Sequence, residues 1–273
     1  MEIQASLQSL HLSSPQAREV AQFYCQCYAM TLTQSGPDWV CTASGRKLVL
    51  SPGPANQLQY AQFGLHGAQA WASFVERTQN LQPAALPKPW STPARAFKDP
   101  DGNLMLFAPA QNELTHAPAA PSAATLQHFA LRSTRLPEML AFYQNQLGFV
   151  LSDVVKDDTD EMRACFFRTE HLHHVLALFG ATAPCFDHQS FEVPAWDDMK
   201  RWGDHMAKLK VPIVWGLGRH GPGNDVFFMV RDPDGNLAEI SSEIESCAPT
   251  RPAGVWPHEE RTLNLWGKAI LRS

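Results

Sequence analysis

Short segments in which apolar and polar residues alternate recur along the chain and predict β-strands with one face packed into a core. Gln8–Leu12 and Gln127–Leu131 are two such segments, and each leads into a stretch of helical character. Further helices are predicted near residues 67–79 and 195–208, with strand-like segments before and after them. Each half of the chain is therefore expected to run strand, helix, several strands, second helix and more strands.

Two landmarks in each half show that this pattern is a repeat. The sequence Asp-Pro-Asp-Gly-Asn occurs at 99–103 and again at 232–236, each time followed by a short apolar run. It predicts a tight turn that leads into a strand. The first helical stretch of each half also ends in Phe-Tyr, at Tyr24 and at Tyr143. We therefore expect an α+β protein with two modules of the same construction.

The repeat also sets the expected domain boundaries. Residues 1–111 form the first module and residues 125–247 the second, and residues 112–124 between them contain HAPAAPSAA, which is typical of a linker. Residues 248–273 lie outside the repeat. The tryptophans of this tail, Trp256 and Trp266, indicate packing over a surface, as a lid or an oligomer contact.

Composition excludes several classes of protein. Apolar residues make up 44% of the chain, enough for a sizeable core, and the net charge of −5 argues against a nucleic-acid binder. Neither a long apolar run nor an export signal is present, so we expect a cytoplasmic protein with no membrane span. The six cysteines form no CxxC pair and are expected to be free thiols. The 11 histidines, most of them in the second half, make a metal site a candidate.

Three predicted strands of the second module each carry one polar residue on the face opposite to apolar neighbours: His128 opposite Phe129 and Leu131, His188 opposite Phe191 and Val193, and Glu239 opposite Ala238 and Ile240. Two histidines and one carboxylate form the facial triad of non-haem Fe(II) oxygenases, which leaves coordination positions for substrate and dioxygen. The alternative is that all three are ordinary hydrogen-bonded or surface residues.

The first module favours the metal site. When the repeats are matched on their shared landmarks, Ser9 stands in place of His128, Tyr60 in place of His188 and Leu106 in place of Glu239. The first module thus keeps the scaffold without any of the three ligands. The fold does not require these residues, and a functional role explains them better.

With these residues in view, the chain resembles the type I extradiol ring-cleaving dioxygenases of the vicinal oxygen chelate superfamily. The resemblance extends to about residue 245 and is strongest over 126–245. It implies tandem modules built from paired βαβββ units, each a curved, open, barrel-like sheet with helices outside, of which only the second binds metal. It also implies Fe(II) as the cofactor, with Mn(II) as the alternative, held by His128, His188 and Glu239.

The same resemblance implies roles for two further histidines. His174 corresponds to the acid/base of the family, and His220, within a glycine-rich segment, corresponds to the histidine that hydrogen-bonds substrate near the metal. Alternation along the predicted strand places His174 and His173 on different faces, so one of the pair can point inward. The remaining histidines are interpreted as ordinary polar residues.

One position departs from the family pattern. The family usually has a tyrosine ten residues before the carboxylate ligand, and here that position is Met229, in the expected substrate pocket. Methionine cannot donate a hydrogen bond and makes the pocket more apolar. The change is compatible with an unusual substrate, a slower reaction or a different reaction on the same metal scaffold.

Together these observations predict an oxidoreductase that cleaves a catechol-type ring next to its diol and incorporates both atoms of O2. Its expected partners are a small aromatic substrate and O2, and the resemblance implies a homo-oligomer. Two alternatives stay open: another divalent-metal enzyme, such as a lyase, isomerase or hydrolase, and a non-catalytic protein that binds a small aromatic molecule. The sequence does not fix the substrate.

Overall fold

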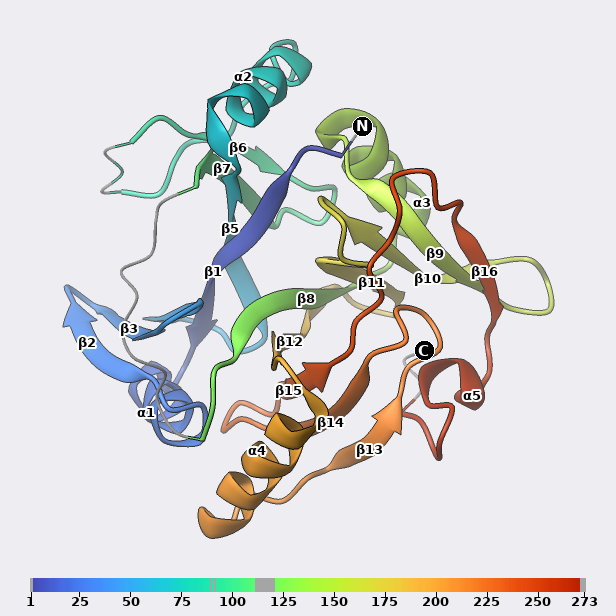
Figure 1. Cartoon of the computed structure of the whole chain (residues 1–273). Helices are drawn as coiled ribbons and strands as arrows, with labels where there is room; N and C mark the ends of the chain where they lie inside the picture. The colour runs from blue at the N-terminus through green and yellow to red at the C-terminus, as the bar shows by residue number, and fades with distance from the viewer. Residues whose placement is uncertain (1, 89, 91, 111–120, 271–273) are drawn as a thin grey trace.

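A computed structural model describes residues 2–88, 90, 92–110 and 121–270 (Figure 1). The first sheet consists of β1 (Ala5–Ser14), β2 (Thr31–Ser35), β3 (Asp38–Ala43), β4 (Arg46–Pro52), β5 (Gln57–Leu65), β6 (Arg95–Lys98) and β7 (Leu104–Pro109), with α1 (Ala17–Cys27) after β1 and α2 (Gly67–Arg77) after β5. Most of the expected linker, residues 112–120, lies outside the described residues.

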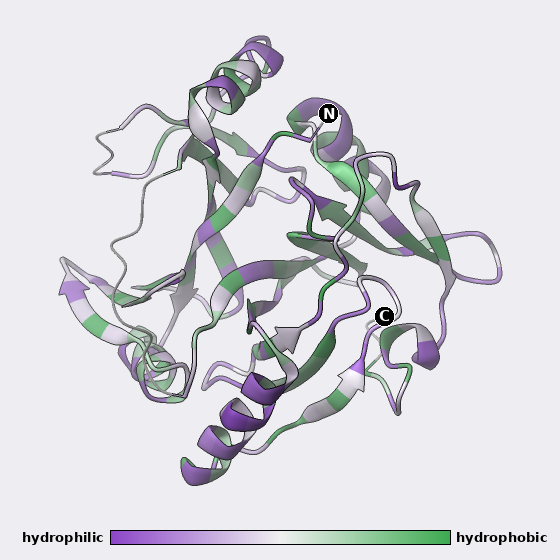
Figure 2. Ribbon diagram, in the orientation of Figure 1, coloured by the Kyte–Doolittle hydropathy of each residue, from purple (hydrophilic) through white to green (hydrophobic). Residues whose placement is uncertain are grey.

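The second sheet has the same construction with additions. Its strands are β8 (Thr125–Ser133), β9 (Val150–Lys156), β10 (Met162–Arg168), β11 (Leu176–Gly180), β12 (Cys185–Glu192), β13 (Trp215–Arg219), β14 (Val226–Arg231), β15 (Leu237–Ser242) and β16 (Gly254–Pro257). The helices are α3 (Leu136–Ala141) after β8, α4 (Trp196–Lys208) after β12 and α5 (Glu260–Leu263) after β16. In Figure 2 the outward-facing α4 is largely hydrophilic.

The order of the strands confirms the predicted α+β repeat. The first sheet runs β2-β3-β4-β1-β5-β7-β6, and the second runs β9-β10-β11-β8-β12-β15-β14 with β16 added at one edge and β13 at the other. Within the part of the chain that the structure describes, the second unit of the first module therefore has one strand fewer than the expected βαβββ. Its segment between α2 and β6 carries four prolines, which cannot donate the hydrogen bonds of a strand.

The helices lie at the predicted positions, but the first helix of each module continues beyond the Phe-Tyr pair at which it was expected to end. The second helices of the two modules, α2 and α4, fall within the predicted windows. By contrast α1 continues past Tyr24, and α3 is extended by a π-helical segment over Phe142–Leu147. That segment ends at Gly148, whose φ of 82° is a left-handed conformation that glycine adopts without strain.

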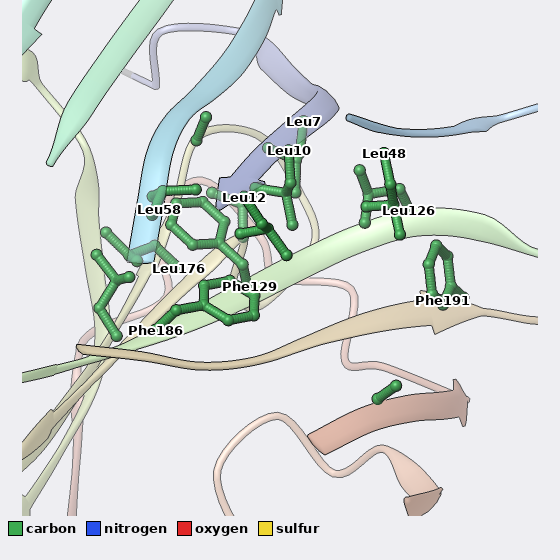
Figure 3. Close-up of a cluster of buried hydrophobic side chains, with 14 of the residues drawn as sticks. Leu7, Leu10, Leu12, Leu48, Leu58, Leu126, Phe129, Leu176, Phe186 and Phe191 are labelled. Carbon is green, nitrogen blue, oxygen red and sulfur yellow. The ribbon is translucent and has the colours of Figure 1, made fainter. Parts of the chain in front are cut away.

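The two sheets share one hydrophobic core. Leu10 and Leu12 of β1 meet Phe129 of β8 there (Figure 3), and the rings of Phe63 and Phe129 lie 6.3 Å apart between centroids. On the other face of the second sheet, Ala130 belongs to a separate apolar cluster. Successive residues of β8 thus point into different clusters, as the alternation predicts. The second cluster is the one that surrounds the candidate site.

The landmarks of the repeat contact each other across the two modules. Tyr24, from the Phe-Tyr pair of the first module, donates a hydrogen bond of 3.0 Å to Asp232 of the second Asp-Pro-Asp-Gly-Asn turn. Tyr143 of the second module donates one of 2.9 Å to Asp99 of the first turn. Each tyrosine therefore joins its own module to the turn of the other, which gives the repeated residues a structural role. We call this pair of contacts the tyrosine clasp.

The tail is built into the second sheet. Strand β16 pairs in parallel with β9, and α5 follows it toward the candidate site. The indole of Trp256 donates a hydrogen bond of 2.8 Å to the buried carboxylate of Asp153. Among the described residues, the helices are too short or too polar to cross a membrane.

Candidate metal centre

Strand register places the three predicted ligands on one face of the second sheet. Ser190 of β12 pairs with His128 of β8 on one side and with Glu239 of β15 on the other. His188 lies two residues from Ser190 on the same strand, so its side chain shares that face. All three side chains are buried, and one donor atom from each lies within 4.8 Å of the others. The structure thus brings together three residues of which the first, His128, and the last, Glu239, are more than 100 positions apart in the sequence.

The first module carries the predicted substitutions at the matched positions. Gln62 of β5 pairs with Ser9 on one side and with Leu106 on the other, just as Ser190 of β12 pairs with His128 and Glu239. Tyr60 lies two residues from Gln62, where His188 lies relative to Ser190. The strand register therefore confirms the matched positions that the repeat predicts.

The residue before each histidine orients its ring. Gln127 accepts a hydrogen bond from Nδ1 of His128, and Asp187 accepts one from Nδ1 of His188 at 2.6 Å. A neutral imidazole whose Nδ1 carries the proton has a free electron pair on Nε2, which is the atom a metal binds. Nε2 of His188 lies 3.9 Å from Oε2 of Glu239. Gln127 and Asp187 were not identified from the sequence, although each directly precedes a predicted ligand.

The electrostatics of the group suit a divalent cation. Burial lowers the pKa of His128 well below its ordinary value, and the neighbouring His174 and His188 lower it further. His128 is therefore a neutral imidazole near neutral pH, the form that coordinates metals. Glu239 places a carboxylate in the same buried space, where a cation offsets the cost of burying the charge. Two imidazole nitrogens and one carboxylate oxygen fit Fe(II) or Mn(II).

A small apolar cavity of about 20 Å³ adjoins the triad. Its walls combine histidines with apolar residues: His128, Phe166, His174, Ala177, Phe179, His188, Trp215, His220, Pro222, Met229 and Leu263. A space of this size holds about one water molecule, so an aromatic ring enters only when part of the wall moves. Leu263, from α5 of the tail, is part of that wall.

His174 lies against the triad, with its ring centroid 4.4 Å from that of His128. His174 lines the cavity and His173 does not, yet both are buried and their Nδ1 atoms lie 3.0 Å apart, so the expected separation onto two faces of a strand is not what the structure shows. The reason is local: both residues precede β11, in irregular backbone where strand alternation does not apply.

His220 also reaches the site. Its Nδ1 donates a hydrogen bond of 2.6 Å to the carbonyl of Leu263, and its ring stacks on Phe227 with centroids 3.8 Å apart. Nε2 of His220 lies 4.0 Å from Oε2 of Glu239. The glycine-bounded loop and the tail together hold this ring beside the candidate ligands.

Asp225 is a further buried acid that was not identified from the sequence. Its carboxylate, with His220 and Glu239, forms a second group of potential donors within 4.8 Å that shares Glu239 with the triad. Burial raises the pKa of Asp225 to about 7, although the neighbouring His220 opposes the shift. Its position directly after the glycine-rich segment was the one available signal.

Comparison with known proteins finds similarity to the family that the sequence resembles. Residues 125–240 match the family described as "Glyoxalase/Bleomycin resistance protein/Dioxygenase superfamily". Metapyrocatechase 2 of Cupriavidus necator is 30% identical over 200 residues, which cover 64% of this chain and 60% of that relative. Biphenyl-2,3-diol 1,2-dioxygenase of Paraburkholderia xenovorans (strain LB400) is 25% identical over 246 residues, 83% of this chain and 81% of the relative.

Solved structures share the fold over nearly the whole chain. Homoprotocatechuate 2,3-dioxygenase of Brevibacterium fuscum, in complex with 3,4-dihydroxyphenylacetate, superimposes with a TM-score of 0.80 at 21% identity, over 97% of this chain and 89% of that one. The Mn(II)-bound glyoxalase of Novosphingobium aromaticivorans gives a TM-score of 0.78 at 22% identity, over 96% and 90%. At these identities the likeness concerns the fold.

Proposed function

We propose that the protein is a non-haem Fe(II)-dependent extradiol dioxygenase, because residues 125–240 match the Glyoxalase/Bleomycin resistance protein/Dioxygenase superfamily. It acts on a catechol-type substrate and opens the ring next to the diol with O2. The observation that carries this proposal is the buried group of His128, His188 and Glu239 on one face of one sheet. The relatives named as metapyrocatechase and biphenyl-diol dioxygenase support it.

Each residue of the site has a distinct part in the proposed reaction. His128 and His188 present Nε2, and Glu239 presents a carboxylate oxygen, as the metal ligands. When bound, Fe(II) supplies coordination positions for both substrate oxygens and for O2, so that the reactants are held side by side. His174 accepts a proton from a substrate hydroxyl and later returns one to the opening ring. His220 hydrogen-bonds through Nε2, since its Nδ1 is engaged by Leu263.

The walls of the cavity favour an uncharged catechol. Among the described residues that line it there is no lysine or arginine. The guanidinium of Arg219, from the adjacent β13, instead pairs with Glu243 at 2.6 Å and lies over the ring of Trp266. A carboxylate on the substrate ring would therefore be buried without a cationic partner, which costs several kcal/mol. We expect catechol and alkylcatechols to react faster than catechols that carry an acid group.

The test begins with metal content and oxygen uptake. Protein purified without oxygen should contain about one iron per chain, and catechols should induce oxygen uptake together with the visible absorbance of a ring-opened product. His188→Ala should lose the metal because it removes one of three ligands, and oxygen uptake should fall with it. His66→Ala, an exposed histidine of the first module, is the matched control and should retain both. Full metal occupancy in His188→Ala would contradict the ligand assignment.

A second candidate is a lyase, isomerase or hydrolase that uses a divalent metal on the same scaffold. The presence of Met229 in the cavity favours it, because this side chain cannot hydrogen-bond a substrate oxygen. Metal binding without oxygen uptake on any catechol would support this candidate. Absence of metal under all loading conditions would instead leave a non-catalytic protein that binds a small aromatic molecule.

A further inference from the structure

A chain of buried polar groups begins at Nδ1 of His174 and continues through His173 to Asp153. Nδ1 of His174 lies 3.0 Å from Nδ1 of His173, and Nε2 of His173 lies 3.0 Å from Oδ2 of Asp153. His173 and Asp153 are fully buried. None of the expected roles accounts for this arrangement, which buries a carboxylate and two imidazoles in direct succession.

We propose that His173 is a positioning residue for His174, and that Asp153 and His173 together determine which nitrogen of His174 carries a proton. The proposal rests on the proposed function, in which His174 is the acid/base. His173 does not line the cavity and would act through His174 alone.

The order of atoms fixes the tautomers. A carboxylate only accepts hydrogen bonds, so the Asp153 oxygen 3.0 Å from Nε2 of His173 favours the tautomer that carries its proton on that nitrogen. In a neutral His173 the remaining nitrogen, Nδ1, is then an acceptor. His174 must therefore donate from its own Nδ1, and its Nε2 keeps a free electron pair. In this state His174 is a base.

The same chain converts His174 into an acid without leaving a charge on its ring. When Nε2 of His174 takes a proton from a substrate hydroxyl, the proton on its Nδ1 moves across the 3.0 Å contact to Nδ1 of His173. His173 becomes an imidazolium ion beside the Asp153 carboxylate, and His174 is neutral with its proton on Nε2. Return of that proton to the opening ring reverses each step, so no proton is gained or lost over the cycle. The positive charge stands next to a carboxylate instead of in an apolar cavity.

The tail holds Asp153 in place. Oδ1 of Asp153 accepts hydrogen bonds from the backbone nitrogen of Gly254 at 2.9 Å and from the Arg251 guanidinium at 3.0 Å, and Oδ2 accepts the Trp256 indole. Burial by itself raises the pKa of Asp153, but His173, Arg251 and Trp256 outweigh it and hold the pKa well below its ordinary range. Asp153 is therefore a carboxylate throughout the cycle, as the relay requires.

Variants at His173 and Asp153 test the relay through turnover. His173→Leu removes the contacts with both Asp153 and His174, and we expect kcat to fall about 10²-fold with KM changed less than about threefold. His173→Gln can still bridge Asp153 and His174 but cannot carry the proton onward, so its kcat should lie between those of His173→Leu and the wild type. Asp153→Asn should lower kcat in the same way. His171→Ala is the matched control, because His171 is an exposed histidine two residues away, and it should leave kcat unchanged.

A spectroscopic measurement tests the relay without reference to turnover. Imidazole ¹⁵N chemical shifts of the diamagnetic Zn(II)-loaded protein report the tautomer of each histidine. We expect His174 protonated on Nδ1 in the wild type and in His171→Ala, and a shift toward the Nε2-protonated form or a mixture in His173→Leu. Metal content and melting temperature of each variant show whether the site and the fold persist.

The outcomes separate the relay from the proposed function. If His174 in the wild type is protonated on Nε2 alone, or if folded, metal-loaded His173→Leu keeps its tautomer and its kcat, the relay is wrong. If no catechol is oxidised by the wild type but the ¹⁵N shifts behave as expected, the proposed function fails while the positioning of His174 by His173 stands.

Discussion

Met229 lines the cavity but offers no hydrogen-bond donor with which to hold a catechol oxygen. It is buried and lies directly beside Glu239 in the pairing of β14 with β15. A side chain at this position therefore points into the cavity next to a candidate metal ligand. The substrate hydrogen bond that a hydroxyl would provide here has to come from His220 or His174, or is not made.

Met229→Tyr places a phenolic hydroxyl at this position. We expect kcat/KM for catechol to rise about tenfold relative to Met229→Phe, because one hydrogen bond to the substrate is worth about 1.4 kcal/mol. The phenylalanine variant has nearly the same volume, so it separates the hydroxyl from any effect of packing. Steady-state oxygen uptake measures both variants. Equal values for the two would mean that the hydroxyl has no partner in the site.

For single residues, the sequence predicts which side chains share a face where the backbone is a regular strand. It does not predict this where the backbone is irregular. His128, His188 and Glu239 were found because period-two alternation puts a polar side chain opposite an apolar face. The burial of His173 could not be predicted in that way, because the backbone before β11 has no fixed period. Asp153 was missed because its significance depends on contacts with Arg251 and Gly254, nearly 100 residues away.

The elements are held together where the two turns meet the two tyrosines. In the tyrosine clasp, Asp232 accepts the Tyr24 hydroxyl and also the backbone nitrogens of its own turn. Burial raises the pKa of Asp232 to about 6, against about 3.9 for an unfolded chain. The folded state therefore binds this proton more tightly than the unfolded state, and the stability it contributes at low pH is lost as the pH rises from about 4 to about 6.

Asp232→Asn removes this titration while it keeps an acceptor oxygen at the turn. We expect the free energy of unfolding of the wild type, relative to Asp232→Asn, to decrease by about 1–3 kcal/mol between pH 4 and pH 7. Urea unfolding at the two pH values gives the difference. Asp234→Asn makes the same change in net charge two residues away and serves as the control. A difference that is independent of pH would show that Asp232 titrates alike in both states.

The elements themselves were largely predictable, and the additions to the repeat were not. Strands and helices shared by both modules follow from alternation and from the turn sequences, whose positions agree in the two halves. Strand β16 has only four residues and pairs at an edge, so neither its length nor its burial produces a clear period. The packing of the tail could be expected from its tryptophans, but its pairing with β9 could not.

Across the whole molecule, the tail supports the site from two sides. Leu263 fixes His220 through its carbonyl, while Arg251, Gly254 and Trp256 fix Asp153 behind His174. The three candidate ligands, in contrast, stand on the central strands β8, β12 and β15. Under the proposed function, metal binding and proton transfer would thus depend on different parts of the chain.

This division predicts how the protein inactivates on warming. An edge strand with a half-exposed pattern opens more readily than central strands, so its backbone amides should exchange hydrogen faster than those of β8 and β12. We expect oxygen uptake to be lost at a lower temperature than either bound metal or circular dichroism. Simultaneous loss of all three would mean that the tail and the central strands unfold as one unit.

The parallel pairing of β16 with β9 therefore has a consequence for heat resistance. If the proposed function holds, a protein that keeps its metal and its sheets after His174 and His220 have lost their support from the tail would be inactive but intact, and we expect it to recover on cooling once the four residues of β16 rejoin the edge of the sheet. The temperature limit of its activity would be set by that short strand, and stabilising the central core would leave the limit where it is.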